Sequence, residues 1–312
     1  MILAGSSDPG ARKYLKFLEK KSKFKFKFIK NFTTSHNKLK STKLIITGAA
    51  LGNSIDNQLI KWAKKNNIAS IGIIENWSNL KLRYLNNKKY TFPRYIFVND
   101  LYCKKKLIQY GAIKSNIHVC GNILLEKQIN DSKKNKNLYK FNLKYKKKLI
   151  FISQPLKEDF GLRTIRELGY NEFKVLNLIK QKLSLYYEFY IKLHPRDNLR
   201  KYDDFINNFK IFKQKKFTEI VNNYDLIIGM NSMLLIELGL IRDNVFSLMP
   251  SKKNEFIGTR LKIVKDIEHL VIDKKFIFTS PKFKLNKSPK FLNDSLQKTL
   301  RKLNHIYMDC IN

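Results

Sequence analysis

Two stretches of the sequence place polar side chains directly after a short apolar run. Residues 190–197 read Tyr-Ile-Lys-Leu-His-Pro-Arg-Asp, and residues 227–232 read Ile-Ile-Gly-Met-Asn-Ser. In open α/β sheets, ligands bind at the carboxyl ends of parallel strands, which is where such residues would stand. His194 can donate a hydrogen bond and titrates near neutrality, and Arg196 lies close by, so this stretch suits an anionic ligand. The structural alternative is that Pro195 simply ends the strand and that His194 is a surface residue.

The elements that must position these residues alternate between strand and helix patterns along the chain. Short apolar runs predict strands over residues 1–4, 24–28, 44–47, 69–74, 95–98, 117–119, 149–152, 189–193, 226–229 and 245–248. Amphipathic patterns predict helices over residues 11–20, 171–183, 218–223, 233–240 and 293–304. This alternation is typical of βαβ units and predicts an α/β fold built on doubly wound parallel sheets.

The length and one biased stretch indicate two domains. A chain of 312 residues fits two domains of ordinary size better than a single core. Residues 131–148 are rich in Lys and Asn and poor in apolar periodicity, as expected for a linker. We therefore predict an N-terminal domain over residues 1–133, a linker over 134–148 and a C-terminal domain over 149–312.

The composition limits the classes of partner and location. The net charge of +37 favours anionic membrane surfaces, acidic glycans or nucleic acid, although the accompanying Asn, Ile, Phe and Tyr indicate that codon bias contributes to it. No nucleic-acid-binding motif accompanies the charge, so nucleic acid is not expected as a partner. The three cysteines are scattered, which predicts neither a disulfide framework nor a zinc site. No apolar run approaches the roughly 20 residues that span a bilayer, so we expect a cytoplasmic protein.

Several predicted strand ends of the first half carry small, polar or acidic residues. The loop over residues 48–54 could cradle a phosphate with backbone amides, but it matches neither a Walker loop nor the dinucleotide fingerprint. Asp8, Glu75 and Asp100 are the acids that we predict at this rim. Asp8 could instead cap the first helix, and Glu75 could instead pair with a lysine. The remaining candidate rim residues are Gly10, Gly48, Asn53, Trp77 and Asn122, and Trp77 is equally compatible with packing and with an exposed indole that stacks on a sugar or base.

The layout as a whole resembles a known architecture. Two doubly wound halves joined by a short linker look like the GT-B fold of nucleotide-sugar glycosyltransferases and of the related UDP-N-acetylglucosamine 2-epimerases. Residues 95–111, followed by 116–122 ending in Gly-Asn, are similar to the end of the amino-terminal domain in that superfamily. The resemblance implies two Rossmann-like domains that face a cleft.

The second half resembles bacterial sialyltransferases, polysialyltransferases and capsule Kdo transferases more particularly. The similar stretches are residues 152–156, 193–196 and 231–237. In those families a His-Pro pair and a Ser/Thr-rich motif hold the CMP part of the donor, which implies phosphate contacts from His194 and Ser232 and ribose contacts from Glu237. The full set of nucleotide- and phosphate-binding residues implied in this way is Gln154, Pro155, His194, Pro195, Arg196, Asn231, Ser232 and Glu237.

The resemblance implies a metal-independent glycosyltransferase without a cofactor, whose donor is a CMP-linked acid sugar or a UDP-sugar. The acceptor would be a surface polysaccharide or lipopolysaccharide, carried on a glycan or lipid at the anionic inner membrane surface. The acidic base motif of the sialyltransferases is missing, so the catalytic candidates are Asp8, slightly ahead of Glu75, together with His194. The alternatives are a 2-epimerase or hydrolase, for which Met233 and Leu234 replace an expected Gly-Gly pair, and a non-catalytic protein that binds polyanions or a partner.

Overall fold

The computed structural model describes residues 1–32, 41–86, 88–140, 147–161, 164–212, 217–251, 256–267, 282–284 and 289–311. These residues form two compact units, of which the first comprises Met1–Gln128 with Pro289–Asn312 and the second comprises Ile129–Ser288. No helix in the described ranges is both long enough and apolar enough to cross a membrane.

The first unit is built on a sheet of six parallel strands in the order β2-β1-β3-β4-β7-β8. The strands are β1 (Ile2–Gly5), β2 (Phe26–Phe28), β3 (Leu44–Thr47), β4 (Ala69–Ile73), β7 (Tyr95–Val98) and β8 (Ile117–Val119). The helices between them are α1 (Pro9–Lys21), α2 (Ile55–Lys65), α3 (Leu101–Gln109) and the 3-10 turn η2 (Lys114–Asn116). A two-stranded antiparallel hairpin, β5 (Leu85–Asn86) and β6 (Lys89–Tyr90), precedes β7.

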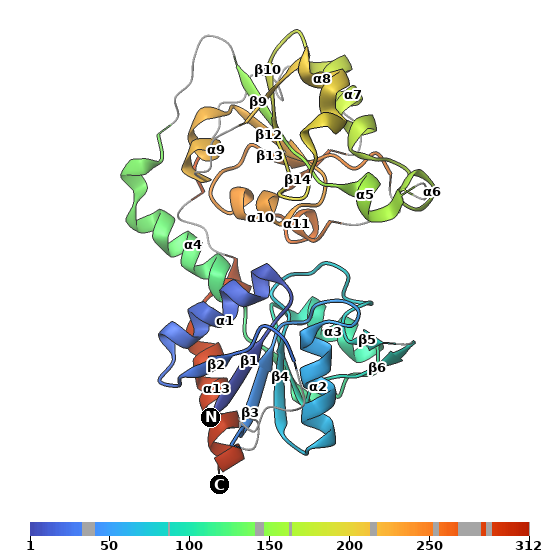
Figure 1. Cartoon of the computed structure of the whole chain (residues 1–312). Coiled ribbons are helices and arrows are strands. Elements are labelled where there is room, and N and C mark those ends of the chain that lie inside the picture. Colours follow the sequence, from blue (N-terminus) through green and yellow to red (C-terminus); the bar gives the residue numbers. More distant parts are fainter. Residues whose placement is uncertain are drawn as a thin grey trace. The chain divides into compact units, whose positions relative to one another are not determined.

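Both faces of this sheet are buried, which explains why its strands read as continuous apolar runs. Ile2 and Leu44 pack on one face in a core that includes residues of α1 and of α13 (Ser295–Ile311). Leu3 and Ile45, one position along, pack on the other face against α2. Figure 1 shows α1 and α13 on one side of the sheet and α2 on the other.

The C-terminal helix changes the predicted domain boundaries. Residues 149–312 were expected to form the second domain, but α13 belongs to the first unit, where Leu303 and Ile306 are buried in the core of its sheet. The red α13 beside the blue N-terminal elements shows this in Figure 1. Helix α4 (Ile123–Lys134) contains the boundary between the units, and residues 141–146 of the predicted linker lie outside the described residues.

The second unit is built on another sheet of six parallel strands, in the order β11-β10-β9-β12-β13-β14. The strands are β9 (Lys148–Ile152), β10 (Glu188–Lys192), β11 (Phe209–Ile211), β12 (Leu226–Gly229), β13 (Val245–Ser247) and β14 (Lys265–Asp266). Its helices are α5 (Leu156–Phe160), α6 (Thr164–Leu168), α7 (Glu172–Leu183), α8 (Asp203–Ile206), α9 (Phe217–Asn223), α10 (Met233–Gly239) and α11 (Ile257–Arg260), with 3-10 turns η3 (Lys136–Leu138) and η5 (Leu199–Tyr202). Another 3-10 turn, η6 (Lys290–Leu292), precedes α13 in the first unit.

The strand orders locate the ligand-binding edge of each unit. In both sheets the direction of strand addition reverses once, between β1 and β3 in the first and between β9 and β12 in the second. The second sheet has the dinucleotide-fold order, with its third, second and first strands followed by the fourth, fifth and sixth. Ligands of such sheets bind outside the carboxyl ends of the strands at the reversal point. The predicted fold class, two Rossmann-like doubly wound units, is confirmed.

Candidate functional sites at the carboxyl edges

The reversal point of the second sheet brings together two predicted residues that are far apart in the sequence. Gln154 follows β9 and Asn231 follows β12, and the Asn231 amide donates to Gln154 Oε1 at 2.8 Å. Ser232 caps α10 by accepting from the Leu234 amide at 3.2 Å. The structure therefore places Gln154, Asn231 and Ser232 at one edge, with Ser232 also acting as the helix cap that its residue type allows.

The geometry around His194 orients its ring as a donor. The Arg196 amide donates to His194 Nδ1 at 3.2 Å, so the neutral ring carries its proton on Nε2. Burial, followed by the charge of Arg196, lowers the pKa of His194, so the ring is neutral at pH 7. The Arg196 guanidinium forms two hydrogen bonds with Asp159, at 2.7 and 3.0 Å, on the exposed surface. His194 is therefore a neutral, half-buried hydrogen-bond donor, and Arg196 is engaged by a carboxylate.

Asp197 holds the His194 loop to the end of β9. Its Oδ2 accepts from the His194 amide and from Ser153 Oγ, both at 2.8 Å. Its Oδ1 lies 2.6 Å from Lys201 Nζ. Burial alone would raise the pKa of Asp197, but these hydrogen bonds and the lysine charge outweigh it and lower the pKa. The loop that presents His194 is thus anchored by an ionised carboxylate.

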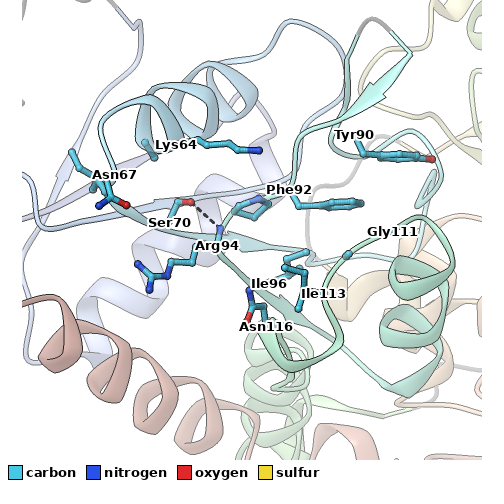
Figure 2. Close-up of a pocket in the computed structure, with 14 residues that line it drawn as sticks. Lys64, Asn67, Ser70, Tyr90, Phe92, Arg94, Ile96, Gly111, Ile113 and Asn116 are labelled. Atoms are coloured by element: carbon cyan, nitrogen blue, oxygen red, sulfur yellow. Dashed lines mark hydrogen bonds between the residues drawn. The ribbon is translucent and has the colours of Figure 1, made fainter.

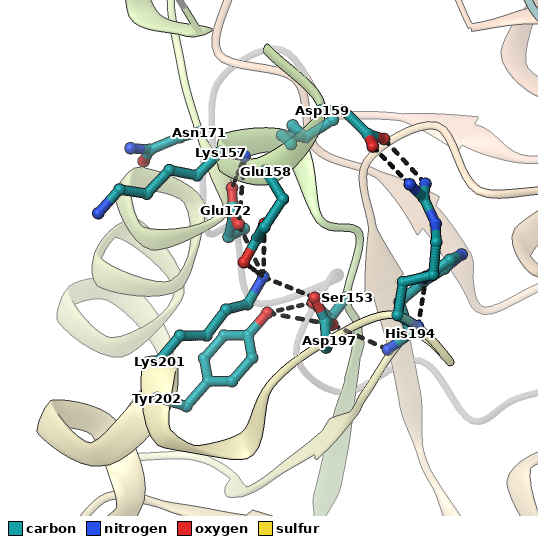
Figure 3. A network of polar contacts seen from close by, with 12 residues as sticks. Ser153, Lys157, Glu158, Asp159, Asn171, Glu172, His194, Asp197, Lys201 and Tyr202 are labelled. Carbon is teal, nitrogen blue, oxygen red and sulfur yellow. Dashed lines mark hydrogen bonds and ion pairs between the residues drawn. The ribbon is translucent and has the colours of Figure 1, made fainter. Parts of the chain in front are cut away.

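Lys201 is the centre of a buried polar network, which Figure 3 shows. Its ammonium lies 2.9 Å from Glu172 and 3.1 Å from Glu158, in addition to Asp197. The side chains of Glu172 and Asp197 are fully buried and that of Lys201 is 11% exposed. Burial alone would lower the pKa of Lys201, but the hydrogen bonds to Asp197 and Glu172 raise it. Tyr202 completes the network through a short hydrogen bond with Ser153.

The reversal point of the first sheet is occupied by a buried carboxylate that the sequence analysis did not select. Asp56, in the first turn of α2, accepts from Ser6 Oγ at 2.7 Å and from the Ser7 amide at 2.8 Å. Burial raises the pKa of Asp56. A Cβ on Gly48 would lie 2.5 Å from the Ala11 side chain and 2.6 Å from Ser6 Oγ, so only glycine fits there. Gly48 therefore allows the β1 and β3 loops to approach closely.

Two other predicted residues of this edge have identifiable local partners. Asp8 caps α1, and its Oδ1 accepts from the Gly10 and Ala11 amides at 2.6 and 3.0 Å. This is the structural alternative that its residue type offered. Asn53 is exposed and accepts from Gln58 Nε2 at 3.3 Å.

Glu75 ends β4 as a buried carboxyl, 6% exposed. Its Oε1 accepts from Asn76 Nδ2 at 2.5 Å, and its Oε2 lies 3.8 Å from the Arg83 guanidinium. Burial raises the pKa of Glu75, and the positive charge of Arg83 lowers it by a smaller amount. The negative charge of Asp8 adds to the increase. A buried carboxyl with a raised pKa at a ligand-binding edge is a candidate for proton transfer.

Arg83 fixes the loop that carries Glu75. Its guanidinium donates to Ala49 O at 3.0 Å, Asn76 Oδ1 at 2.7 Å and Ser78 O at 2.9 Å. These bonds tie the loop after β4 to the end of β3. Arg83 has no recognisable sequence signal, because nothing in its spacing links it to the loops that follow two different strands.

Trp77 and Asn122 stabilise the first unit from inside. The Trp77 indole is 6% exposed and donates to Asp100 Oδ2 at 2.8 Å, so the interpretation of an exposed stacking indole is wrong. Its ring also packs edge-on against Phe291, with centroids 5.8 Å apart. Asn122 Nδ2 donates to Glu75 O at 2.6 Å, and its Oδ1 accepts from the Leu124 and Leu125 amides at the start of α4. Trp77 is therefore a packing residue, while Asn122 directly supports the backbone of Glu75.

The comparisons with known proteins agree on the fold. No protein-family model and no curated protein sequence matches the chain. Among solved structures, the chain is similar to the UDP-GlcNAc 2-epimerase of Methanocaldococcus jannaschii in complex with UDP-GlcNAc and UDP, with a TM-score of 0.61 and 14% identity over 97% of this chain and 99% of that one. It is also similar to MnaA of S. aureus in complex with UDP, with a TM-score of 0.61 and 12% identity over 99% and 96%. The Rickettsia bellii UDP-N-acetylglucosamine 2-epimerase gives a TM-score of 0.57 at 12% identity over 99% and 95%.

These similarities correct the main functional expectation. Several of the similar structures that span nearly the whole chain are described as UDP-GlcNAc 2-epimerases. The sequence-based expectation of a glycosyltransferase with sialyltransferase-like motifs is therefore wrong, and the epimerase alternative is better supported. The short motifs do not identify a family, because a His-Pro pair and a Ser at a helix start are also common where a parallel strand ends in a turn.

Proposed function

We propose that this chain is an enzyme of the UDP-GlcNAc 2-epimerase type, which acts on a UDP-sugar without a separate acceptor. The observation that carries the proposal is the likeness, over nearly the full chain, to epimerase structures, one of them solved in complex with UDP-GlcNAc and UDP. The dinucleotide-fold strand order of the second unit supports a nucleotide site at the β9 and β12 ends.

The second unit supplies the groups for the UDP part. His194 Nε2–H is a neutral donor at the end of β10, and Gln154 and Asn231 meet at the reversal point. Met233 and Leu234 occupy the positions at which the resemblance implies two glycines. We therefore assign the phosphate contacts to His194 and Asn231 and not to the backbone amides of α10. Asp197 serves as a positioning residue, because it holds the His194 amide.

The chemistry at the sugar requires proton transfer. Inverting C2 breaks the C2–H bond and moves that proton to a base, while the electron pair forms a C1–C2 double bond and expels UDP from C1. UDP then returns to C1 as a proton is added to the opposite face of C2, which restores the balance of bonds and charge. Glu75 suits one of these proton transfers because its raised pKa lies closer to neutral pH than the ordinary pKa of a glutamate. The proton that is returned comes from an acid in exchange with solvent, so it carries the isotope of the solvent.

The direct test is turnover of UDP-GlcNAc in D₂O without any acceptor, followed by proton NMR. We expect deuterium at C2 of the sugar, either in the epimeric UDP-sugar or in a free sugar released together with UDP. Unchanged UDP-GlcNAc, with protium retained at C2 under conditions in which UDP binds, would refute the proposal.

The nucleotide site is tested by UDP binding to His194→Ala. Loss of a hydrogen bond to a charged phosphate costs about 1.5–3 kcal/mol, which corresponds to roughly 10- to 150-fold weaker binding. Calorimetric titration with UDP measures this effect, and His194→Gln, which keeps an N–H donor, should retain part of the affinity. The matched control is His305→Ala, because His305 lies in α13 and pairs with Asp309 at 2.8 Å. Equal UDP affinity in wild type and His194→Ala would contradict the assigned role.

A further inference from the structure

The first unit carries a pocket at the edge of its sheet opposite to the carboxyl ends. Its volume is about 460 Å³, within the range of small-molecule sites. It lies where α2 leads into β4 and where the loops before β7 and β8 begin, and Figure 2 shows the side chains that line it. These are the amino ends of the strands, so the pocket is separate from the edge that carries Glu75.

Two aromatic rings, those of Tyr90 and Phe92, line the pocket, and other rings pack against them. Tyr90 and Phe92 are stacked, with centroids 5.3 Å apart and planes 4° apart. Tyr110 stacks on Tyr90 at 5.9 Å, and Tyr84 packs edge-on against Phe92 at 5.8 Å. The Tyr90 hydroxyl donates to Lys81 O at 2.7 Å, which fixes the ring. The half-buried rings of Tyr90 and Phe92 thus form a preorganised apolar platform.

The opposite side of the pocket carries cations. Lys64 and Arg94 line it, and among the described residues neither has a carboxylate partner. The carbonyl groups at the C-terminal end of α2 disfavour a bound anion. One of them, Ala63 O, already accepts a hydrogen bond from the Ile68 amide at 2.9 Å. Lys64 lies in the last turn of α2, where a cation is favourable. The net local charge is therefore positive.

A second hollow extends this pocket. Its volume is about 370 Å³, and it shares Asn67, Ile68 and Arg94 with the first. It adds Lys43 and Asp309, and the Asp309 carboxylate is engaged by His305 at 2.8 Å. Because both hollows include Arg94 in their lining, we take them as one surface, which we call the amino-edge groove.

We propose that the amino-edge groove binds an acidic oligosaccharide. The sugar rings lie on the Tyr90–Phe92 platform, and their carboxylates pair with Arg94 and with Lys64 or Lys43. Arginine suits this role because its planar guanidinium binds carboxylates in a bidentate manner. Two adjoining hollows that are both lined by cations favour a chain of charged sugars over a single compact nucleotide. This inference is independent of the proposed epimerase activity, because it concerns the other edge of the sheet.

The test is calorimetric titration of the full chain at 150 mM salt, about the physiological ionic strength, with three probes. These are a galacturonic acid tetramer, a neutral chitotetraose of equal length and UMP. We expect the acidic tetramer to bind at least about tenfold more tightly than the neutral one, since charge-assisted hydrogen bonds are absent from the latter. Tighter binding of chitotetraose or of UMP, or no binding of the acidic tetramer, would overturn the proposal.

Variants localise the site. Arg94→Gln should weaken binding of the acidic tetramer by about tenfold or more, and Phe92→Leu should weaken it by removing half of the platform. Lys105→Gln is the matched control, because it removes one positive charge from the exposed face of α3, outside the groove. If Lys105→Gln weakens binding as much as Arg94→Gln does, the interaction reflects the overall charge of +37 and the groove is not the site.

Discussion

Replacing Lys201 with methionine is expected to lower the free energy of unfolding of the second unit by about 3–5 kcal/mol. The change leaves the carboxylates of Glu172 and Asp197, both fully buried, without the ammonium that lies 2.9 and 2.6 Å from them. Removing one partner from a buried ion cluster leaves uncompensated charge in a medium that solvates it poorly. Methionine keeps the length of the side chain, so the effect isolates the charge.

The measurement must report on one unit at a time. Both tryptophans, Trp62 and Trp77, lie in the first unit, so their fluorescence does not follow the second. Hydrogen exchange read by mass spectrometry on peptides of β10 and α7 reports the opening of the second unit directly. Peptides of the first unit serve as an internal reference. The matched variant is Lys210→Met, because Lys210 pairs with Glu188 but its side chain is 66% exposed, and its exchange should stay close to that of wild type.

The same cluster predicts a dependence on pH. Folding lowers the pKa of Asp197, so its contribution is fully present above the unfolded pKa of about 3.9 and is lost as the pH falls through the lower folded value. In Lys201→Met the buried Asp197 carboxylate lacks the ammonium, so burial favours its protonated form. The difference between wild type and variant should therefore be large at pH 7 and shrink as the pH falls, first through the raised pKa of Asp197 in the variant and then through its lowered pKa in wild type. A difference that stays constant from neutral to acidic pH would argue against an electrostatic origin.

Replacing Glu75 with glutamine is expected to lower turnover of UDP-GlcNAc by about 10²–10⁴-fold, the usual contribution of a general acid or base. Glutamine is nearly isosteric, and Arg83 keeps its bonds to Ala49, Asn76 and Ser78. The loop after β4 should therefore keep its geometry while it loses the proton-transfer group. Trp77 fluorescence, which reports on this same loop, checks that the variant is folded.

Asp8→Asn separates the two acids that the sequence analysis proposed. Asparagine caps helices as well as aspartate does, so this variant keeps the acceptor for the Gly10 and Ala11 amides and removes only the charge. We expect Asp8→Asn to retain most activity while Glu75→Gln loses it. The reverse result would transfer the proton-transfer role to Asp8.

The pH profile provides a second readout for Glu75. Burial raises the pKa of this carboxyl, so a rate that needs its ionised form should rise with pH through a value above the ordinary range for glutamate. Arg83→Met removes the charge that opposes this increase, and it should move the rising limb of kcat/KM to higher pH. An unchanged profile in Arg83→Met would show that a different group limits the rate.

The sequence by itself determined the elements and the fold class. The apolar runs at residues 44–47, 149–152 and 226–229 match β3, β9 and β12, because a strand buried on both faces must be apolar at every position. The alternation with helices was sufficient to predict two doubly wound parallel sheets. The polar residues after the strands were identified for the same reason, since Gln154 and Asn231 follow apolar runs directly.

Only the tertiary structure decided which of these polar residues support the fold and which are placed for chemistry. The amphipathic pattern of α13 is the same whichever sheet it covers, so its place in the first unit depends on the core that Leu303 and Ile306 complete. The sequence left open whether Trp77 is buried or exposed, because its indole donates to Asp100, which follows a different strand. The spacing of four residues links Lys201 only to Asp197, because Glu172 approaches it from 29 positions earlier in the chain. Such residues act through contacts between distant segments, and the pattern around one residue does not encode those contacts.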